Sequence, residues 1–274
     1  LSIRRDESSK FHKDNRVGYF PSVSAGWNVH QEKWFQNPVM SKLKIRASYG
    51  ELGANFLNPY NFDAIAYGPI PYTVGGERYV TGRAAYLKSK DLKWETAKTT
   101  DIGIELGFFN NDLTLSLDYF VKKNVDLLAQ IDLNLSSGQI FEINSSREKP
   151  YVNTASVKNT GWEFMMNYRK QLTKDFHIDA TFNIATLKNK VLSLGENVQP
   201  ITSGAMSSYF NDAASITMPG EAIGSFYGYK IDGFDAEGNF IFADTDKNGV
   251  VNANDKVILG SPIPDFTYGL NINM

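Results

Sequence analysis

The 274-residue chain contains no cysteine. Disulfide bonds, thiolate zinc sites and cysteine nucleophiles are therefore excluded, and long loops must be held by other contacts. The sequence also lacks a run of eighteen apolar residues, so no segment is long and apolar enough for a membrane-spanning helix. Strands of a transmembrane β-barrel need only about nine to eleven residues with every second one apolar, so a membrane protein stays possible.

Neither sign of charge dominates: the chain contains 28 Lys and Arg residues and 30 Asp and Glu residues, which gives a net charge of −2. We expect no nucleic-acid partner, since such partners bind basic surfaces. The three histidines, His12, His30 and His177, are far apart in the sequence. There is no Gly-x-Ser-x-Gly, phosphate-binding glycine loop or His-Glu-x-x-His motif, so we expect no catalytic residues and no enzyme.

Five stretches alternate apolar and polar residues, at 102–108, 113–121, 162–168, 176–184 and 266–274. In the fourth, apolar side chains at even positions, from Phe176 to Ile184, alternate with His177, Asp179, Thr181 and Asn183. A pleated strand sends successive side chains to opposite faces, so this period predicts strands with one apolar and one polar face.

Short and long connections alternate between the expected strands, which we place at about residues 17–29, 42–50, 99–109, 113–123, 160–169, 176–188 and 265–274. Asn110, Asn111 and Asp112 tolerate a left-handed backbone and predict a tight hairpin. We expect long extracellular loops at 51–98, 124–159 and 189–264, and the Gly, Pro, Tyr and Asn content of the first is turn chemistry rather than strand chemistry. Tight turns on one side and long loops on the other are typical of outer-membrane barrels. The sequence therefore predicts an all-β, antiparallel transmembrane β-barrel with long extracellular loops, in which residues 1–274 form one partial barrel domain.

Aromatic and polar side chains support this reading. Phe108, Phe109, Tyr168 and Phe176 flank the short turns, whereas Tyr119, Phe120 and Trp162 lie one strand length away, which predicts two interfacial girdles. The opposite strand face is polar enough to need water or a polar plug; its members are Glu105, Thr114, Ser116, Asp118, Glu163, Asn167, Arg169, Asp179 and Asn183.

Several segments resemble the SusC/RagA-like TonB-dependent transporters of the Bacteroidetes outer membrane. They are NRVGYFPSVSAGW at 15–27, LKIRASYG at 43–50, LKWET at 92–96, DIGIE at 101–105, FNN at 109–111, NTGWE at 159–163 and ILGSPIPDFTYG at 258–269. The segments span nearly the whole chain in order, so we identify the chain as a C-terminal-half barrel fragment of such a protein.

This resemblance implies part of a 22-stranded barrel. It also implies active import of oligosaccharides or peptides, a SusD-like lipoprotein lid, and energy from TonB through an N-terminal part. The plug domain of the family has no counterpart in this chain. The alternatives are a siderophore-type TonB-dependent receptor, a surface barrel without transport, and a secreted, calcium-dependent glycan-binding β-sandwich.

Residues 244–255 fit a calcium loop of the EF-hand type. Asp244, Asp246 and Asn248 supply oxygen at positions one, three and five, the Val250 carbonyl at seven, and Asp255 at twelve. Gly249 permits the sharp turn at position six. An aspartate in place of the usual glutamate at position twelve reaches less far, so we expect weaker, structural Ca²⁺ binding. The alternative is a solvated turn rich in Asp, Asn and Gly.

The long connections also concentrate aromatic residues: Tyr60, Tyr67, Tyr72, Tyr79, Tyr209, Phe210, Phe226, Tyr227 and Tyr229. Such rings could stack on sugars, pack on a partner protein or bind the loops to one another. The sequence does not select between these roles.

Overall fold

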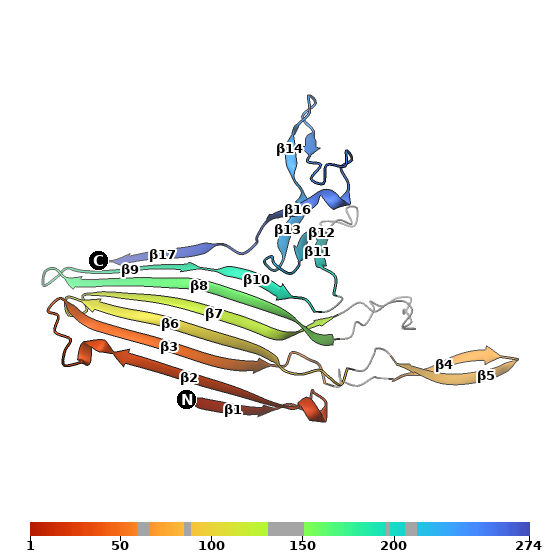
Figure 1. Ribbon diagram of the computed structural model, residues 1–274, viewed down its shortest axis with the longest axis horizontal. Coiled ribbons are helices and arrows are strands. Elements are labelled where there is room, and N and C mark those ends of the chain that lie inside the picture. The colour runs from red at the N-terminus through yellow and green to blue at the C-terminus, as the bar shows by residue number, and fades with distance from the viewer. Residues whose placement is uncertain (60–65, 85–88, 131–150, 196–197, 206–212) are drawn as a thin grey trace. The chain divides into compact units, whose positions relative to one another are not determined.

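The computed structural model describes residues 1–59, 66–84, 89–130, 151–195, 198–205 and 213–274. Its largest sheet has the order β1-β2-β3-β6-β7-β8-β9-β17, and β10 also pairs with β8 (Figure 1). The bounds are β1 Ser2–Glu7, β2 Val17–Asn28, β3 Met40–Ala54, β6 Glu95–Phe108, β7 Leu113–Gln130, β8 Tyr151–Gln171, β9 His177–Thr186, β10 Lys188–Ser193 and β17 Phe266–Asn273. Within these described ranges, no helix is long and apolar enough to cross a membrane.

Four strands of the large sheet, β3, β6, β7 and β8, are longer than the alternation predicts. β6 begins at Glu95, β7 continues to Gln130 and β8 begins at Tyr151, so residues expected in loops lie in strands. β1 was not expected, because Ile3 is its only large apolar residue. It forms by pairing with β2. Each of its faces carries an ion pair between residues two apart: Arg4 with Asp6 at 2.8 Å on one face, and Arg5 with Glu7 at 3.3 Å on the other.

The long connections contain strands of their own, and the expectation of turn rather than strand chemistry in 51–98 was wrong. β4 (Ala66–Val74) and β5 (Glu77–Ala84) form a hairpin whose turn uses Gly75 and Gly76 at φ 64° and 86°. In the region 189–264, β11 (Ile201–Ala205), β12 (Ala213–Thr217), β13 (Ser225–Tyr229) and β16 (Lys256–Gly260) form a four-stranded sheet. β14 (Ile231–Phe234) and β15 (Phe240–Phe242) form a separate hairpin. Local turn chemistry does not exclude strands, since backbone pairing with a distant segment can override it.

The described chain divides into two compact units. The first comprises residues 1–24, 48–100 and 122–156, and its buried cluster consists of Phe11, Leu57 and Leu92, packed against Trp94, Leu128 and Tyr151. The rings of Phe11 and Trp94 lie 5.3 Å apart, and the indole N–H of Trp94 donates to the Arg16 carbonyl at 3.1 Å. Apolar packing and side-chain hydrogen bonds thus hold these connections without disulfides.

The second unit comprises residues 25–47, 101–121 and 157–274 and contains the tight turns. Phe109, Asn110 and Asn111 all have a left-handed backbone, at φ 54°, 58° and 69°, and the Asp112 amide donates to the Phe109 carbonyl at 3.1 Å. The left-handed turn expected at the asparagines is confirmed. The turn between β8 and β9 closes where the Leu172 amide donates to the Phe176 carbonyl at 2.9 Å.

Candidate functional site

The pairing of β8, β9 and β17 gives their sheet one apolar face. Directly paired residues of antiparallel strands share a face. On one face, two rows of apolar residues cross the strands in the order β8, β9, β17. The first row is Met166, Phe182 and Leu270, and the second is Phe164, Ile184 and Tyr268. The register thus extends the apolar face over three strands.

The opposite face of the same strands is polar. Asn167 pairs with Thr181 and Thr181 with Asn271, and the Thr181 hydroxyl donates to Asn167 Oδ1 at 2.8 Å. Arg169 and Asp179 form an ion pair at 2.6 Å. The division of faces expected from the alternation is confirmed in this register. Leu115, Ile178 and Phe182 are half-buried rather than enclosed, in contrast to the core of a sandwich.

Aromatic side chains gather at the expected places in the second unit. The rings of Phe108 and Phe109 lie 6.4 Å apart beside the first tight turn. Tyr119 on β7 and Trp162 on β8 lie 4.8 Å apart. That these groups form two girdles at bilayer interfaces stays a prediction.

A network of ion pairs crosses β3, β6 and β7 on the polar face. Glu105 on β6 receives Lys42 at 2.6 Å and Lys44 at 3.4 Å. Arg46 lies 3.6 Å from Glu105 and 2.7 Å from Asp118 on β7, which is only 7% exposed. The positive charges of Lys42, Lys44 and Arg46 and the negative charges of Glu105 and Asp118 therefore largely compensate one another in this part of the barrel wall.

Two glycines make room for this network. A Cβ atom on Gly103 would lie 1.8 Å from Asp118 Oδ1 and 2.8 Å from Arg46 Nε. One on Gly107 would lie 2.8 Å from Cβ of Lys42, the β3 partner of Glu105. The side chains of β3 and β7 thus lie across the backbone of β6, which explains why glycine stands on both sides of Glu105.

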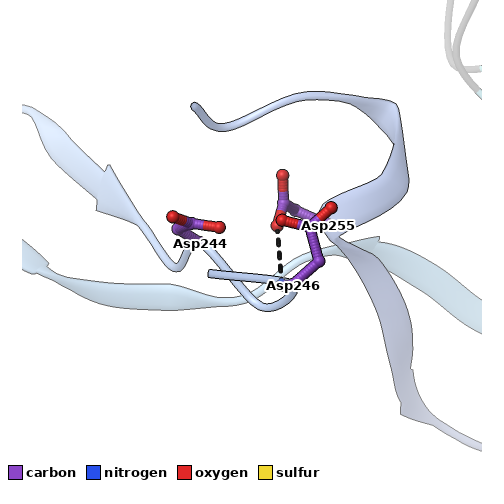
Figure 2. A group of neighbouring side chains, drawn as sticks. All are labelled: Asp244, Asp246 and Asp255. Carbon is purple, nitrogen blue, oxygen red and sulfur yellow. Dashed lines mark hydrogen bonds between the residues drawn. The ribbon is translucent and has the colours of Figure 1, made fainter. Parts of the chain in front are cut away.

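The acidic loop lies between β15 and β16, and its three carboxylates gather (Figure 2). Asp244 accepts the amides of Asn248 at 3.1 Å and Gly249 at 2.7 Å, and Asn248 Oδ1 accepts the Val250 amide at 2.8 Å. Lys247 and Gly249 have φ 60° and 88°, so the chain turns sharply at position six as the template requires.

The oxygen atoms in this loop have separations that suit a shared cation. One carboxylate oxygen each from Asp244, Asp246 and Asp255 lies within 4.8 Å of the others. Two oxygens bound to one Ca²⁺ at about 2.3–2.6 Å lie at most about 5 Å apart. The Val250 carbonyl accepts Asn252 Nδ2 at 3.0 Å and keeps a second lone pair. Three of the five expected ligands, the carboxylates of Asp244, Asp246 and Asp255, are thus brought together, and three negative charges at this separation favour a cation.

Asp255 holds the loop in shape. It is 0% exposed, and its carboxylate accepts the amides of Asn252 at 2.8 Å, Thr245 at 2.7 Å and Asp246 at 3.3 Å. These backbone hydrogen bonds, that of Asn252 foremost, hold the pKa of the Asp255 carboxyl below its ordinary value, because they stabilise the charged form.

Sequence reasoning missed some of these residues. It placed Glu105 and Asp118 on the polar face but not their partners Lys42, Lys44 and Arg46, although these alternate with Leu43 and Ile45 and so carried a signal.

Among the loop aromatics, Tyr60, Tyr209 and Phe210 lie outside the described residues, and Phe226 is exposed.

The family model described as TonB dependent receptor-like, beta-barrel, matches residues 1–273. The chain belongs to this family. TonB-dependent receptor P3 of Formosa agariphila is 35% identical over 99% of this chain, and TonB-dependent receptor SusC of Bacteroides thetaiotaomicron is 31% identical over 100% of it. Each match spans 28% of the relative, so the chain covers under a third of the length of these proteins.

Solved structures of the RagAB peptide importer share the fold. The open-open state matches 98% of this chain and 28% of the solved chain, with a TM-score of 0.78 and 22% identity. The closed-closed state matches with a TM-score of 0.74 and 23% identity.

Membership in the TonB-dependent receptor family confirms the expected antiparallel barrel fold and places the chain in the bacterial outer membrane. The family consists of receptors and transporters rather than enzymes. The alternative of a secreted β-sandwich was wrong, because the family match spans nearly the whole chain.

Proposed function

We propose that the parent protein actively imports oligosaccharides or peptides across the outer membrane, as the barrel of a SusC-like TonB-dependent transporter. In this proposal a SusD-like lipoprotein covers the external mouth. TonB acts through an N-terminal part of the parent. Outer-membrane lipid surrounds the apolar face of the strands. The observation that carries the proposal is the 31% identity to SusC over the whole chain.

The polar face supports a hydrophilic, weakly charged cargo. Its ionic groups pair with each other, as in Arg46 with Asp118 and Arg169 with Asp179, at 2.7 Å and 2.6 Å. A wall with compensated charges exerts little net field on a passing solute. Neutral glycans and zwitterionic peptides fit such a wall better than a strongly charged solute does.

The test is a deletion of the parent gene in its own host, followed by uptake assays with labelled oligosaccharides, peptides and ferric siderophores. We expect oligosaccharide or peptide uptake to fall, and the same fall when TonB is removed. A loss of siderophore uptake alone would instead identify the siderophore-type receptor. Unchanged uptake of all three solutes would contradict import.

We also propose that the loop 244–255 binds a structural Ca²⁺ through Asp244, Asp246, Asn248, Val250 and Asp255. Support comes from the all-oxygen donor set and from the three carboxylate oxygens within 4.8 Å of one another. The ion would stabilise the conformation of a loop that no disulfide bond can stabilise, because the chain contains no cysteine.

Calorimetry with Ca²⁺ on the parent transporter tests this proposal. Asp246→Ala should abolish the binding heat, whereas Asp232→Ala, which removes an exposed acid outside the loop, should leave it unchanged. No heat from the unmodified protein at millimolar Ca²⁺ would end the proposal, because even extracellular sites bind at roughly 10⁻⁴–10⁻³ M.

A further inference from the structure

The β14–β15 hairpin carries four large apolar side chains on one face. Phe234 pairs directly with Phe240 and Ile231 with Phe242, and the register shifts between Ile231 and Gly233. Phe240 and Phe242 are two residues apart and share a face. The extra residue of this bulge lets Ile231 and Phe234 join the same face although they are three positions apart.

The aromatic members form a continuous, exposed row. Ring centroids are 5.4 Å apart for Phe234 and Phe240, 6.3 Å for Phe240 and Phe242, and 5.5 Å for Phe242 and Tyr229. Phe234 is 65% exposed, Phe240 57% and Phe242 41%. A contiguous exposed apolar row, unlike scattered apolar residues, marks a contact surface.

The turn of the hairpin is held in one shape. Asp235 Oδ1 accepts the amides of Asn239 at 2.7 Å and Glu237 at 3.0 Å, and Gly238 adopts φ 86°. At the base, the Ala243 amide donates to the Lys230 carbonyl at 2.9 Å. The apolar row is therefore presented on a preorganised hairpin, which lowers the entropy cost of binding.

The surroundings of the row are acidic. Residues 231–242, which form the hairpin, contain Asp232, Asp235 and Glu237 and no Lys or Arg, and this charge does not include the carboxylates of the 244–255 loop that would bind Ca²⁺. A second copy of the chain would oppose like charges in a symmetric contact, which disfavours it. A glycan would need polar groups beside the rings for its hydroxyls, but on this face Phe240 has Phe234, Phe242 and Ile231 around it. A protein surface with an apolar centre and a basic rim fits best.

The location of the hairpin selects the partner. The hairpin lies in the connection between β10 and β17. This connection begins beyond the C-terminal end of β9, whereas the tight turn that contains Phe176 precedes the N-terminal end of β9. In an outer-membrane barrel the tight turns face the periplasm and the long connections face the outside. The hairpin is thus on the side where a lid would dock.

We propose that Ile231, Phe234, Phe240 and Phe242 form a docking surface for the SusD-like lipoprotein, whose contacting face has an apolar centre and a basic rim. This inference rests on the proposed function, which supplies the lid. It adds the segment of the transporter that holds the lid and the chemistry of the contact.

The experiment uses the tagged full-length transporter, purified in detergent with the lipoprotein that accompanies it, and measures the affinity of the two purified proteins. Phe240→Ser and Phe234→Ser should each weaken the affinity about 30-fold, as expected for central interface residues. Ile241→Ser is the matched control, since Ile241 pairs with Gly233 on the other face of the same hairpin. It should change the affinity less than about threefold.

The outcomes separate this surface from the proposed function. Binding of the lid to the unmodified transporter with unchanged affinity for Phe234→Ser and Phe240→Ser would overturn the docking surface alone. Failure of any outer-membrane lipoprotein to bind the unmodified transporter would overturn the proposed partnership and this surface with it. If Phe240→Ser does not reach the membrane, Phe234→Ser decides, because its side chain is the most exposed of the aromatic row.

Discussion

Replacing Phe182 with arginine should destabilise the parent barrel strongly. Phe182 lies in the middle of β9, pairs with Met166 on one side and Leu270 on the other, and contacts the ring of Phe164 at 6.3 Å. If this face meets hydrocarbon, an arginine near the bilayer midplane costs about 2–4 kcal/mol. The lost aromatic contact adds about 0.5–1.5 kcal/mol.

The adjacent residue provides the control. Asn183 pairs with Met165 and Gly269 on the opposite face, where a charged side chain keeps its water. Asn183→Arg should therefore change the free energy of unfolding by less than about 0.5 kcal/mol.

The assay is denaturant titration of the parent barrel folded into lipid vesicles, followed by tryptophan fluorescence. A difference of about 2 kcal/mol or more between the two variants supports the assignment of faces. Equal costs, or a larger cost for Asn183→Arg, would refute it.

Three further predictions concern local features. Gly103→Ala should destabilise the barrel by about 1–3 kcal/mol, because its Cβ would lie 1.8 Å from Asp118 Oδ1 and displace a nearly buried carboxylate. Gly269→Ala is the control: its Cβ would lie 3.1 Å from Asn183 Oδ1, so it should cost less free energy of unfolding in the same titration. Asn111→Ala should cost about 1 kcal/mol, since alanine tolerates φ 69° poorly. Because the pKa of Asp255 is lowered, its contribution to loop stability is complete above about pH 4 and is lost as the pH falls through the lowered value; hydrogen exchange in residues 244–255 should accelerate there, and protection that does not change on acidification would contradict this.

The long alternating strands could be predicted because period-two patterning is a local signal. β9 and β17 show it over almost their whole length, and the register then places their large apolar residues on one face. β1 was missed because its residues are mostly charged, and its formation depends on pairing with β2. The β4–β5 hairpin was missed because its glycines and prolines suggested only turns.

The acidic loop could be found from the sequence because all its oxygen donors lie within twelve consecutive residues. The network around Glu105 needs the lateral order of β3, β6 and β7, so its partners Lys42 and Arg46 become evident only in the fold. The apolar row of β14–β15 depends on a bulge beside Gly233, and no sequence period reveals that Ile231 and Phe234 share a face.

The most direct measurement of the central claim is a spin-label scan of residues 178–184 of β9 in the parent transporter reconstituted in lipid. Collision rates with oxygen, which concentrates in hydrocarbon, and with a water-soluble nickel reagent are recorded at each position. We expect labels at 178, 180, 182 and 184 to meet oxygen preferentially and those at 179, 181 and 183 to meet nickel. Accessibility that does not alternate along the strand, or that alternates in the opposite sense, would contradict the account.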